Sequence, residues 1–213
     1  METLVIPNIE NVYRRERARD ELPQSGSGRT VMTAEPKFVP EEAVRVDMED
    51  GAAFSVRLID CVGYMVPGAV GQMEEDAPRM VTTPWFDHPI PMTEAAEVGT
   101  RKVIAEHSTI GIVVTTDGTV TDISREEYLE AENRVITELK ELGKPFLVVL
   151  NSADPDSDRA KAIQADITDR YDVTCMRCNC LELGEEDVTA MLRGVLYEFP
   201  MKELDLFLPA WVD

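Results

Sequence analysis

The sequence TIGIVVTT, residues 109–116, is the most informative stretch about the architecture of this protein. It is a nearly continuous run of apolar and β-branched residues, and such runs are typical of strands that are buried on both faces of a parallel sheet. A second run of this kind, KPFLVVLN, follows at residues 144–151. Pro145 stands at its entrance, where a missing backbone N–H does least harm to a sheet. We therefore expect two buried parallel strands.

Helical patterns separate and follow these strands. Residues 124–143 carry one apolar stripe at helical spacing, between Ser124 as the N-cap and Gly143 as the stop. The stripe consists of Leu129, Val135, Ile136 and Leu139. Further along we expect a helix at 157–170, a strand at 172–178 and a helix at 185–198. This alternation is typical of right-handed βαβ units, so the predicted fold class is α/β with a mostly parallel sheet.

The segment ahead of TIGIVVTT has a different pattern. Residues 43–48 and 54–60 alternate apolar and polar side chains on either side of a turn, which predicts an antiparallel hairpin. Residues 64–92 contain five prolines and are expected to form a long irregular insertion. A helix is then predicted from Thr93, as an approximate N-terminal cap, to about Glu106.

Charge and composition narrow the classes of function. The 213 residues include 41 acidic and 21 basic side chains, a formal net charge of -20, so the surface repels nucleic acid and anionic lipid. No run of 18 apolar residues could span a bilayer, and no stretch has the pattern of a signal peptide. We expect a soluble cytosolic protein that binds no nucleic acid.

Three cysteines form a C-x-x-C-x-C pattern, Cys175, Cys178 and Cys180, which could attract a metal ion. A structural zinc site needs four ligands, and only Cys61 or one of the two histidines could complete this one from a distance. We therefore interpret the three as incidental cysteines at the end of a strand, in a reducing compartment.

Polar residues follow several predicted strands, and open parallel sheets bind ligands beyond the carboxyl ends of their strands. Asp60 and Gly63 form a D-x-x-G pattern at the end of one strand. A carboxylate there can hold Mg²⁺ through a water molecule, and a glycine N–H can approach a terminal phosphate because no side chain obstructs it. The alternative, an acidic residue at an ordinary turn, stays open on these residues alone.

Asn151, Ser152 and Asp154 follow the strand at 144–151. The asparagine could bond the N7 side of a purine and tie neighbouring loops together, and Asp154 could accept hydrogen bonds from guanine. In the usual N-K-x-D guanine motif a lysine stands where this chain has Ser152, so guanine selectivity is not predicted. Asn151 could alternatively be only a loop start.

Thr33 lies upstream of the hairpin, in GSGRTVMTAEP at residues 26–36. Its hydroxyl could ligate Mg²⁺ and its N–H could report a terminal phosphate, with Thr30 as the second choice and a plain turn as the alternative. No stretch of the 213 residues matches G-x-x-x-x-G-K-S/T, the loop that holds the phosphates in P-loop nucleotide hydrolases.

Six segments together resemble the N-terminal ATPase domain of the stage IV sporulation protein A family, from endospore-forming bacteria. The resemblance runs along the whole chain and is carried by DELPQSGSGRTVMTAEPKFVP, VRLIDCVGYMVPGA, PRMVTTPW, EAAEVGTRKVIAEHSTIGIVVTTDGT, KPFLVVLNS and YEFPMKELDLFLPAWVD. It implies a P-loop nucleotide hydrolase fold similar to the translation-factor GTPases, with helices on both faces of the sheet, and it implies ATP and Mg²⁺ as ligands.

The resemblance also implies roles for individual residues. Asp60 is similar to the Walker B acid, Thr33 to the sensor threonine that supports hydrolysis, and Asn151-Ser152 with Pro155 to an altered base-recognition motif. Ala34 stands where family members often have a second threonine. The altered motif does not require the acid Asp154, which leaves the choice of base open.

At the level of the cell, the resemblance implies a mother-cell protein that polymerises with ATP hydrolysis. The homopolymer forms the basement layer of the spore coat on the outer forespore membrane, without a transmembrane segment. A small amphipathic membrane peptide and other coat proteins are the implied partners. A non-catalytic structural module that has lost its P-loop is one alternative, and a GTPase-type switch is another.

Members of the family begin with a strand and a phosphate-binding loop that this sequence does not contain. In the related topology that strand lies between the strands at 54–60 and 109–116. We therefore expect a domain over residues 1–200 that lacks the first strand and Walker A, with 64–92 as an insertion and 201–213 as the start of a connection to a middle domain. A chain with these bounds is expected to be inactive by itself.

Overall fold

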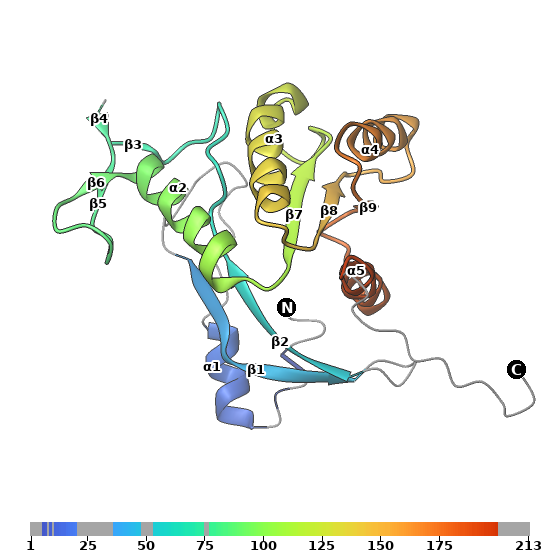
Figure 1. Cartoon of the computed structure of the whole chain (residues 1–213), viewed down its shortest axis with the longest axis horizontal. Coiled ribbons are helices and arrows are strands. Elements are labelled where there is room, and N and C mark those ends of the chain that lie inside the picture. Colours follow the sequence, from blue (N-terminus) through green and yellow to red (C-terminus); the bar gives the residue numbers. More distant parts are fainter. Residues whose placement is uncertain are drawn as a thin grey trace, which may run out of the picture.

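The computed structural model describes residues 6–7, 9, 11–20, 36–47, 53–74 and 77–199 (Figure 1). Two predictions, the role of Thr33 and the connection at 201–213, lie outside these residues. In the part of the chain that is described, three strands form a parallel sheet in the order β7-β8-β9. They are β7 (Gly111–Thr116), β8 (Phe146–Asn151) and β9 (Cys175–Cys178). The predicted parallel pairing of these segments is confirmed.

Helices cover both faces of this sheet, as predicted. They are α3 (Arg125–Glu141), α4 (Asp158–Tyr171) and α5 (Glu185–Tyr197). On one face Ile136 of α3 and Ile167 of α4 pack with alternate residues of β8. On the other face Met191 and Val195 of α5 pack with the remaining residues of the strand. As a result β8 is buried at every position from 146 to 150.

Strand β7 departs from the expectation that both of its faces are buried. Val113 lies in the core with α3 and α4, but Ile112 is 39% exposed and Val114 is 61% exposed. These two residues pair with Leu147 and Val149 of β8, which α5 covers. The apolar run is therefore correct as a strand and wrong as a fully buried strand, because α5 does not reach as far as this edge of the sheet.

The predicted hairpin is confirmed, and its first strand begins earlier than expected. Strand β1 (Lys37–Asp47) pairs antiparallel with β2 (Ala53–Asp60). Among the described residues the two form a sheet of their own, separate from the parallel strands. Val46 and Phe54 pack against Val188 and Leu192 of α5, which attaches the hairpin to the rest of the domain. A polar helix, α1 (Val12–Asp20), lies beside β1 (Figure 1).

The segment predicted as an insertion contains only very short strands. They are β3 (Met73–Glu74), β4 (Ala77–Pro78), β5 (Met80–Val81) and β6 (Ile90–Pro91). The helix α2 (Met92–Lys102) follows and continues as a π-helical turn, η1 (Val103–His107). Its extent confirms the predicted helix, but the cap was predicted wrongly, because the helix begins one residue before Thr93 and Pro91 is its N-cap. Within the described residues, no helix is both long and apolar enough to cross a membrane.

The uneven coverage of the sheet gives a matched pair of substitutions. Val114 and Val149 are register partners in the β7–β8 ladder, with side chains on the same face of the sheet. Val149 is 1% exposed, whereas Val114 is 61% exposed. We expect Val149→Ala to lower the free energy of unfolding by about 2 kcal/mol, from two lost methyl groups and a small cavity. Val114→Ala is expected to cost less than about 0.5 kcal/mol. Urea unfolding followed by circular dichroism measures both, and equal losses would contradict this account of α5.

Candidate functional site

The loops that follow the three parallel strands meet at one edge of the sheet. Thr116, Asn151 and Cys178, the last residues of the strands, are register partners across the sheet. Backbone hydrogen bonds continue past them, from the N–H of Asp117 to the carbonyl of Asn151 at 3.3 Å and from the N–H of Ser152 to the carbonyl of Cys178 at 2.9 Å. The loops after these three strands therefore gather at the carboxyl edge, and ligand binding there stays a prediction.

Asn151 links two of these loops. Its Oδ1 accepts a hydrogen bond from the N–H of Cys180 at 2.9 Å, which fixes the orientation of the amide and confirms the predicted tie between loops. The NH₂ group is then the end of the side chain that is available to a ligand, since it has no acceptor within the described part of the chain. An amide donor of this kind is complementary to the N7 acceptor of a purine.

Ser152 is a buried structural residue. It has no exposed surface, and its hydroxyl donates to Oδ2 of Asp117 at 2.7 Å. The same Oγ accepts from the N–H of Asp154 at 3.1 Å. Ser152, which occupies the position of the lysine in N-K-x-D, therefore connects two loops through buried hydrogen bonds. Asp154 itself is exposed at the surface.

Asp117 is the residue whose role the sequence did not reveal. Its loop lies at the predicted edge, but only the structure shows that the side chain is completely buried. Oδ1 accepts from both the N–H and the hydroxyl of Thr119, at 2.9 and 2.5 Å. Burial favours the neutral form, but the hydrogen bonds from Ser152 and Thr119 outweigh it and lower the pKa of Asp117 below its ordinary value. The carboxylate is thus ionised at neutral pH and organises the edge.

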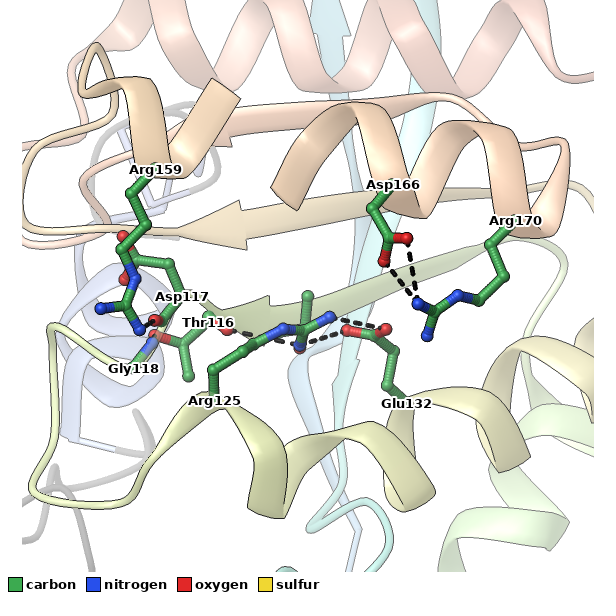
Figure 2. Close-up of polar contacts among 9 residues, drawn as sticks. Thr116, Asp117, Gly118, Arg125, Glu132, Arg159, Asp166 and Arg170 are labelled. Atoms are coloured by element: carbon green, nitrogen blue, oxygen red, sulfur yellow. Dashed lines mark hydrogen bonds and ion pairs between the residues drawn. The ribbon is translucent and has the colours of Figure 1, made fainter. Parts of the chain in front are cut away.

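A buried ion pair fixes the start of α3 against this edge (Figure 2). Arg125 binds both carboxylate oxygens of Glu132, one of them at 2.8 Å, and also donates to Oγ1 of Thr115 at 2.9 Å. Both charged side chains are almost completely buried. The turn between strand and helix is equally tight, because a Cβ on Gly118, at φ +86°, would lie 2.9 Å from the backbone nitrogen of Arg125.

Arg159 of α4 also binds the loop at this edge. Figure 2 shows its guanidinium reaching down from α4 to the backbone of Asp117, where it donates to the carbonyl at 2.8 Å. The positive charge also favours the ionised form of the Asp117 carboxyl. One loop is therefore held by side chains from two helices, α3 and α4.

Asp60 and Gly63 form a second centre at the end of β2. Asp60 is exposed and pairs in register with Lys37 of β1. Partial desolvation raises the pKa of its carboxyl, and the charge of Lys37 opposes this shift. Gly63 has φ +80° and open space where a Cβ would stand, as the predicted approach of a phosphate requires. Within the described residues, no hydrogen bond joins this centre to Asn151, Ser152 or Asp154.

Cys175, Cys178 and Cys180 do not gather into one cluster of sulfur atoms. Cys175 packs in the cluster with α3 and α4, whereas Cys178 packs in the cluster with α5 on the opposite face of the sheet. Cys178 and Cys180 are neighbours, with their sulfur atoms 3.7 Å apart. In the described ranges no group of three or more metal-binding side chains is found.

The chemistry of the described residues suits a purine nucleotide with Mg²⁺. Asp60 offers a carboxylate of the kind that binds Mg²⁺ through water. Gly63 leaves a phosphate room to reach the backbone. Asn151 has an amide donor of the kind that can bind a base, and Asp154 has an exposed carboxylate in the same loop. Groups of these two kinds could bind the terminal phosphate and the base of a nucleotide.

Known proteins resemble this chain over its whole length. A family model described as "Stage IV sporulation protein A, ATPase domain" matches residues 1–200. The chain is 54% identical over 212 residues to stage IV sporulation protein A of Bacillus subtilis (strain 168), 52% identical over 212 residues to that of Bacillus anthracis, and 50% identical over 213 residues to that of Clostridioides difficile (strain 630). Each alignment covers 100% of this chain and 43% of the relative. The chain therefore spans less than half the length of these relatives.

Ser152→Ala tests the buried carboxylate. The change removes one donor to Asp117, so we expect a loss of about 1–3 kcal/mol in the free energy of unfolding at neutral pH. A lowered pKa contributes stability above the unfolded value of about 4, and this contribution is lost as the pH falls through the folded value. The difference between parent and variant is therefore expected to shrink towards about pH 3.

Urea unfolding of parent and variant at neutral pH and at about pH 3 measures this difference in the free energy of unfolding. The control is Ser55→Ala, a change at an exposed position of β2, with an expected effect within about 0.5 kcal/mol at both pH values. A penalty for Ser152→Ala that does not depend on pH would show that the hydroxyl does not act through the charge of Asp117.

Arg125→Met tests the buried ion pair. Removal of the cation leaves the Glu132 carboxylate buried without a counter-ion, and we expect a loss of about 3–5 kcal/mol. In the double variant Arg125→Met/Glu132→Leu no buried charge remains, so most of this loss is expected to disappear. Urea unfolding of the parent, both single variants and the double variant forms a complete cycle. Additive losses would contradict a direct coupling between the two side chains.

Proposed function

The chain belongs to the family of the stage IV sporulation protein A ATPase domain, and from this premise we propose that it supplies the Mg²⁺-acid, phosphate-sensing and base-recognition parts of an ATP hydrolase that drives assembly of the spore coat. The names of its relatives support a role in sporulation. The observation that carries the proposal is the pair of centres at strand ends, Asp60 to Gly63 and Asn151 to Asp154.

At the first centre, the chemistry required of the protein is positioning and electrostatics. Bound Mg²⁺ neutralises charge that develops on the transferred phosphoryl group. In the proposal Asp60 holds the metal through water, Gly63 offers its N–H to the terminal phosphate, and Thr33 adds a hydroxyl ligand. The exposed carboxylate of Asp60 and the open space at Gly63 support these assignments.

At the second centre, we propose that the site binds adenine. The lysine that lies along the base in N-K-x-D proteins is replaced here by Ser152. Ser152 is committed to Asp117 and Asp154 by hydrogen bonds, so it has no contact to offer a base. Asn151 supplies the amide donor for N7, an atom that adenine and guanine share. A GTPase-type switch is the competing function, favoured by the exposed carboxylate of Asp154, which could accept from guanine.

The cellular part of the proposal is supported by the family alone. The protein polymerises with ATP hydrolysis into the basement layer of the spore coat, at the outer forespore surface in the mother-cell cytoplasm. Its partners are further copies of itself, a small amphipathic membrane-binding peptide and other coat proteins. The alternative is a non-catalytic module that keeps the family surface and contributes only contacts to the coat.

Hydrolysis of ATP by the full-length protein tests the proposal. We expect Asp60→Ala and Thr33→Ala each to lower kcat by about 100-fold or more, because Mg²⁺ and the terminal phosphate lose their ligands. Asp169→Ala removes an exposed carboxylate from α4 and is expected to match the parent. The hydrolase proposal fails if both site variants retain the parental rate.

The same assay with GTP separates the two nucleotides. With ATP as the specific substrate, Asp154→Ala is expected to leave kcat/KM for ATP within about twofold, since adenine offers this carboxylate none of guanine's N1 and N2 donors. For a guanine-specific site the same change would lower kcat/KM for GTP by orders of magnitude. A parent that prefers GTP and loses this preference in Asp154→Ala would replace the ATPase proposal with the GTPase switch.

A further inference from the structure

Tyr64, the residue directly after Gly63, is anchored to α3. The side chain is 7% exposed, and its hydroxyl donates a hydrogen bond to the carboxylate of Glu138. The guanidinium of Arg134 lies over the ring, 3.8 Å from its centroid. A hydrogen bond to a carboxylate and a cation–π contact therefore hold the same side chain from two directions.

A second anchor acts on Gly63 itself. Thr100 of α2 is 2% exposed, and its hydroxyl donates to the carbonyl of Gly63 at 3.1 Å. The glycine has open space where a Cβ would stand. The backbone at Gly63 is thus fixed through its carbonyl, while the space where a Cβ would stand stays open.

Ion pairs connect the two helices that carry these anchors. Arg134 of α3 pairs with Glu97 of α2 at 2.9 Å, and Arg101 of α2 approaches Glu138 of α3 at 3.6 Å. These ion pairs contain two cations and two anions, so together they carry no net charge. Burial and the Glu138 carboxylate raise the pKa of Tyr64 to about 12, so the hydroxyl keeps its proton and remains a donor at physiological pH.

Helix α3 also reaches the other centre. At its first residue, Arg125 binds Thr115 at the end of β7, and the same guanidinium is held by Glu132. Glu138, more than three turns after Arg125, holds Tyr64. One continuous helix of 17 residues therefore contacts both the loop edge near the base-recognition residues and the D-x-x-G loop.

We propose that Tyr64 and Thr100 are positioning residues, which hold the Gly63 backbone in place for the terminal phosphate by fixing it to α3 and α2. This inference rests on the proposed hydrolase function. A loop that is fixed before the nucleotide arrives loses no conformational freedom in the transition state, and misplacement by about 1 Å can cost orders of magnitude in rate. The expected effects of losing either anchor are a lower kcat and a looser loop.

The test uses four single variants of the full-length protein. Thr100→Val keeps the shape of the side chain and removes the donor, whereas Thr100→Ser keeps the donor. Tyr64→Phe keeps the ring and removes the bond to Glu138. Tyr197→Phe makes the same change at a tyrosine that is 79% exposed. Amide hydrogen exchange of residues 61–65 is measured without nucleotide, and kcat and KM are measured with ATP and Mg²⁺.

We expect Thr100→Val and Tyr64→Phe to speed exchange of the loop amides by about tenfold and to lower kcat by about tenfold, with KM within about threefold. Thr100→Ser and Tyr197→Phe are expected to behave as the parent. Parental exchange in both Thr100→Val and Tyr64→Phe would overturn the anchoring. Faster exchange with an unchanged kcat would overturn the positioning role.

The exchange measurement also separates this inference from the proposed function. A parent that hydrolyses no ATP would refute the hydrolase, and with it the positioning of a phosphate. In that case faster exchange in the two variants would show that the anchors still organise the loop. An active parent with unaffected variants would refute the positioning role and leave the hydrolase intact.

Discussion

Burial of β8 on both faces is the constraint on which the rest of the domain depends. Every residue from 146 to 150 is buried between α5 on one side and α3 with α4 on the other. Because a strand in this position cannot shift by one residue without exchanging its two sets of side chains, its register is fixed. That register places Asn151 and Ser152 at the carboxyl edge, opposite Thr116 and Cys178.

Buried charge at this edge is balanced locally, in a protein whose formal charge is -20. Arg125 meets Glu132, and the Asp117 carboxylate is satisfied by Ser152 and Thr119. A buried ion that loses its partner costs several kcal/mol, so these contacts specify one arrangement of the loops more than they add stability. Asp60 and Asp154, by contrast, are the exposed acids of the two centres.

The sequence predicted what depends on local periodicity and missed what depends on distant neighbours. The stripe that includes Ile136 and Leu139 located α3, and Gly143 ends it with the expected positive φ. The exposure of Val114 could not be predicted, since it depends on how far α5 extends over the sheet. The role of Ser152 was equally hidden, because Asp117, its partner, is 35 residues away in the chain. Of the candidate site, the sequence predicted the edge and the role of Gly63 but not the groups that support them.

The two centres are separate in hydrogen bonding but share one helix. Arg125, near the base-recognition edge, and Glu138, at the D-x-x-G loop, both belong to α3. A helix transmits displacement as a rigid body, so a shift at one end moves the contacts at the other. Such a shift becomes a signal only when the helix has two discrete positions that the ligands distinguish. The partly exposed ion pairs between α2 and α3 are individually weak, so they alone would not hold the two helices in a single position.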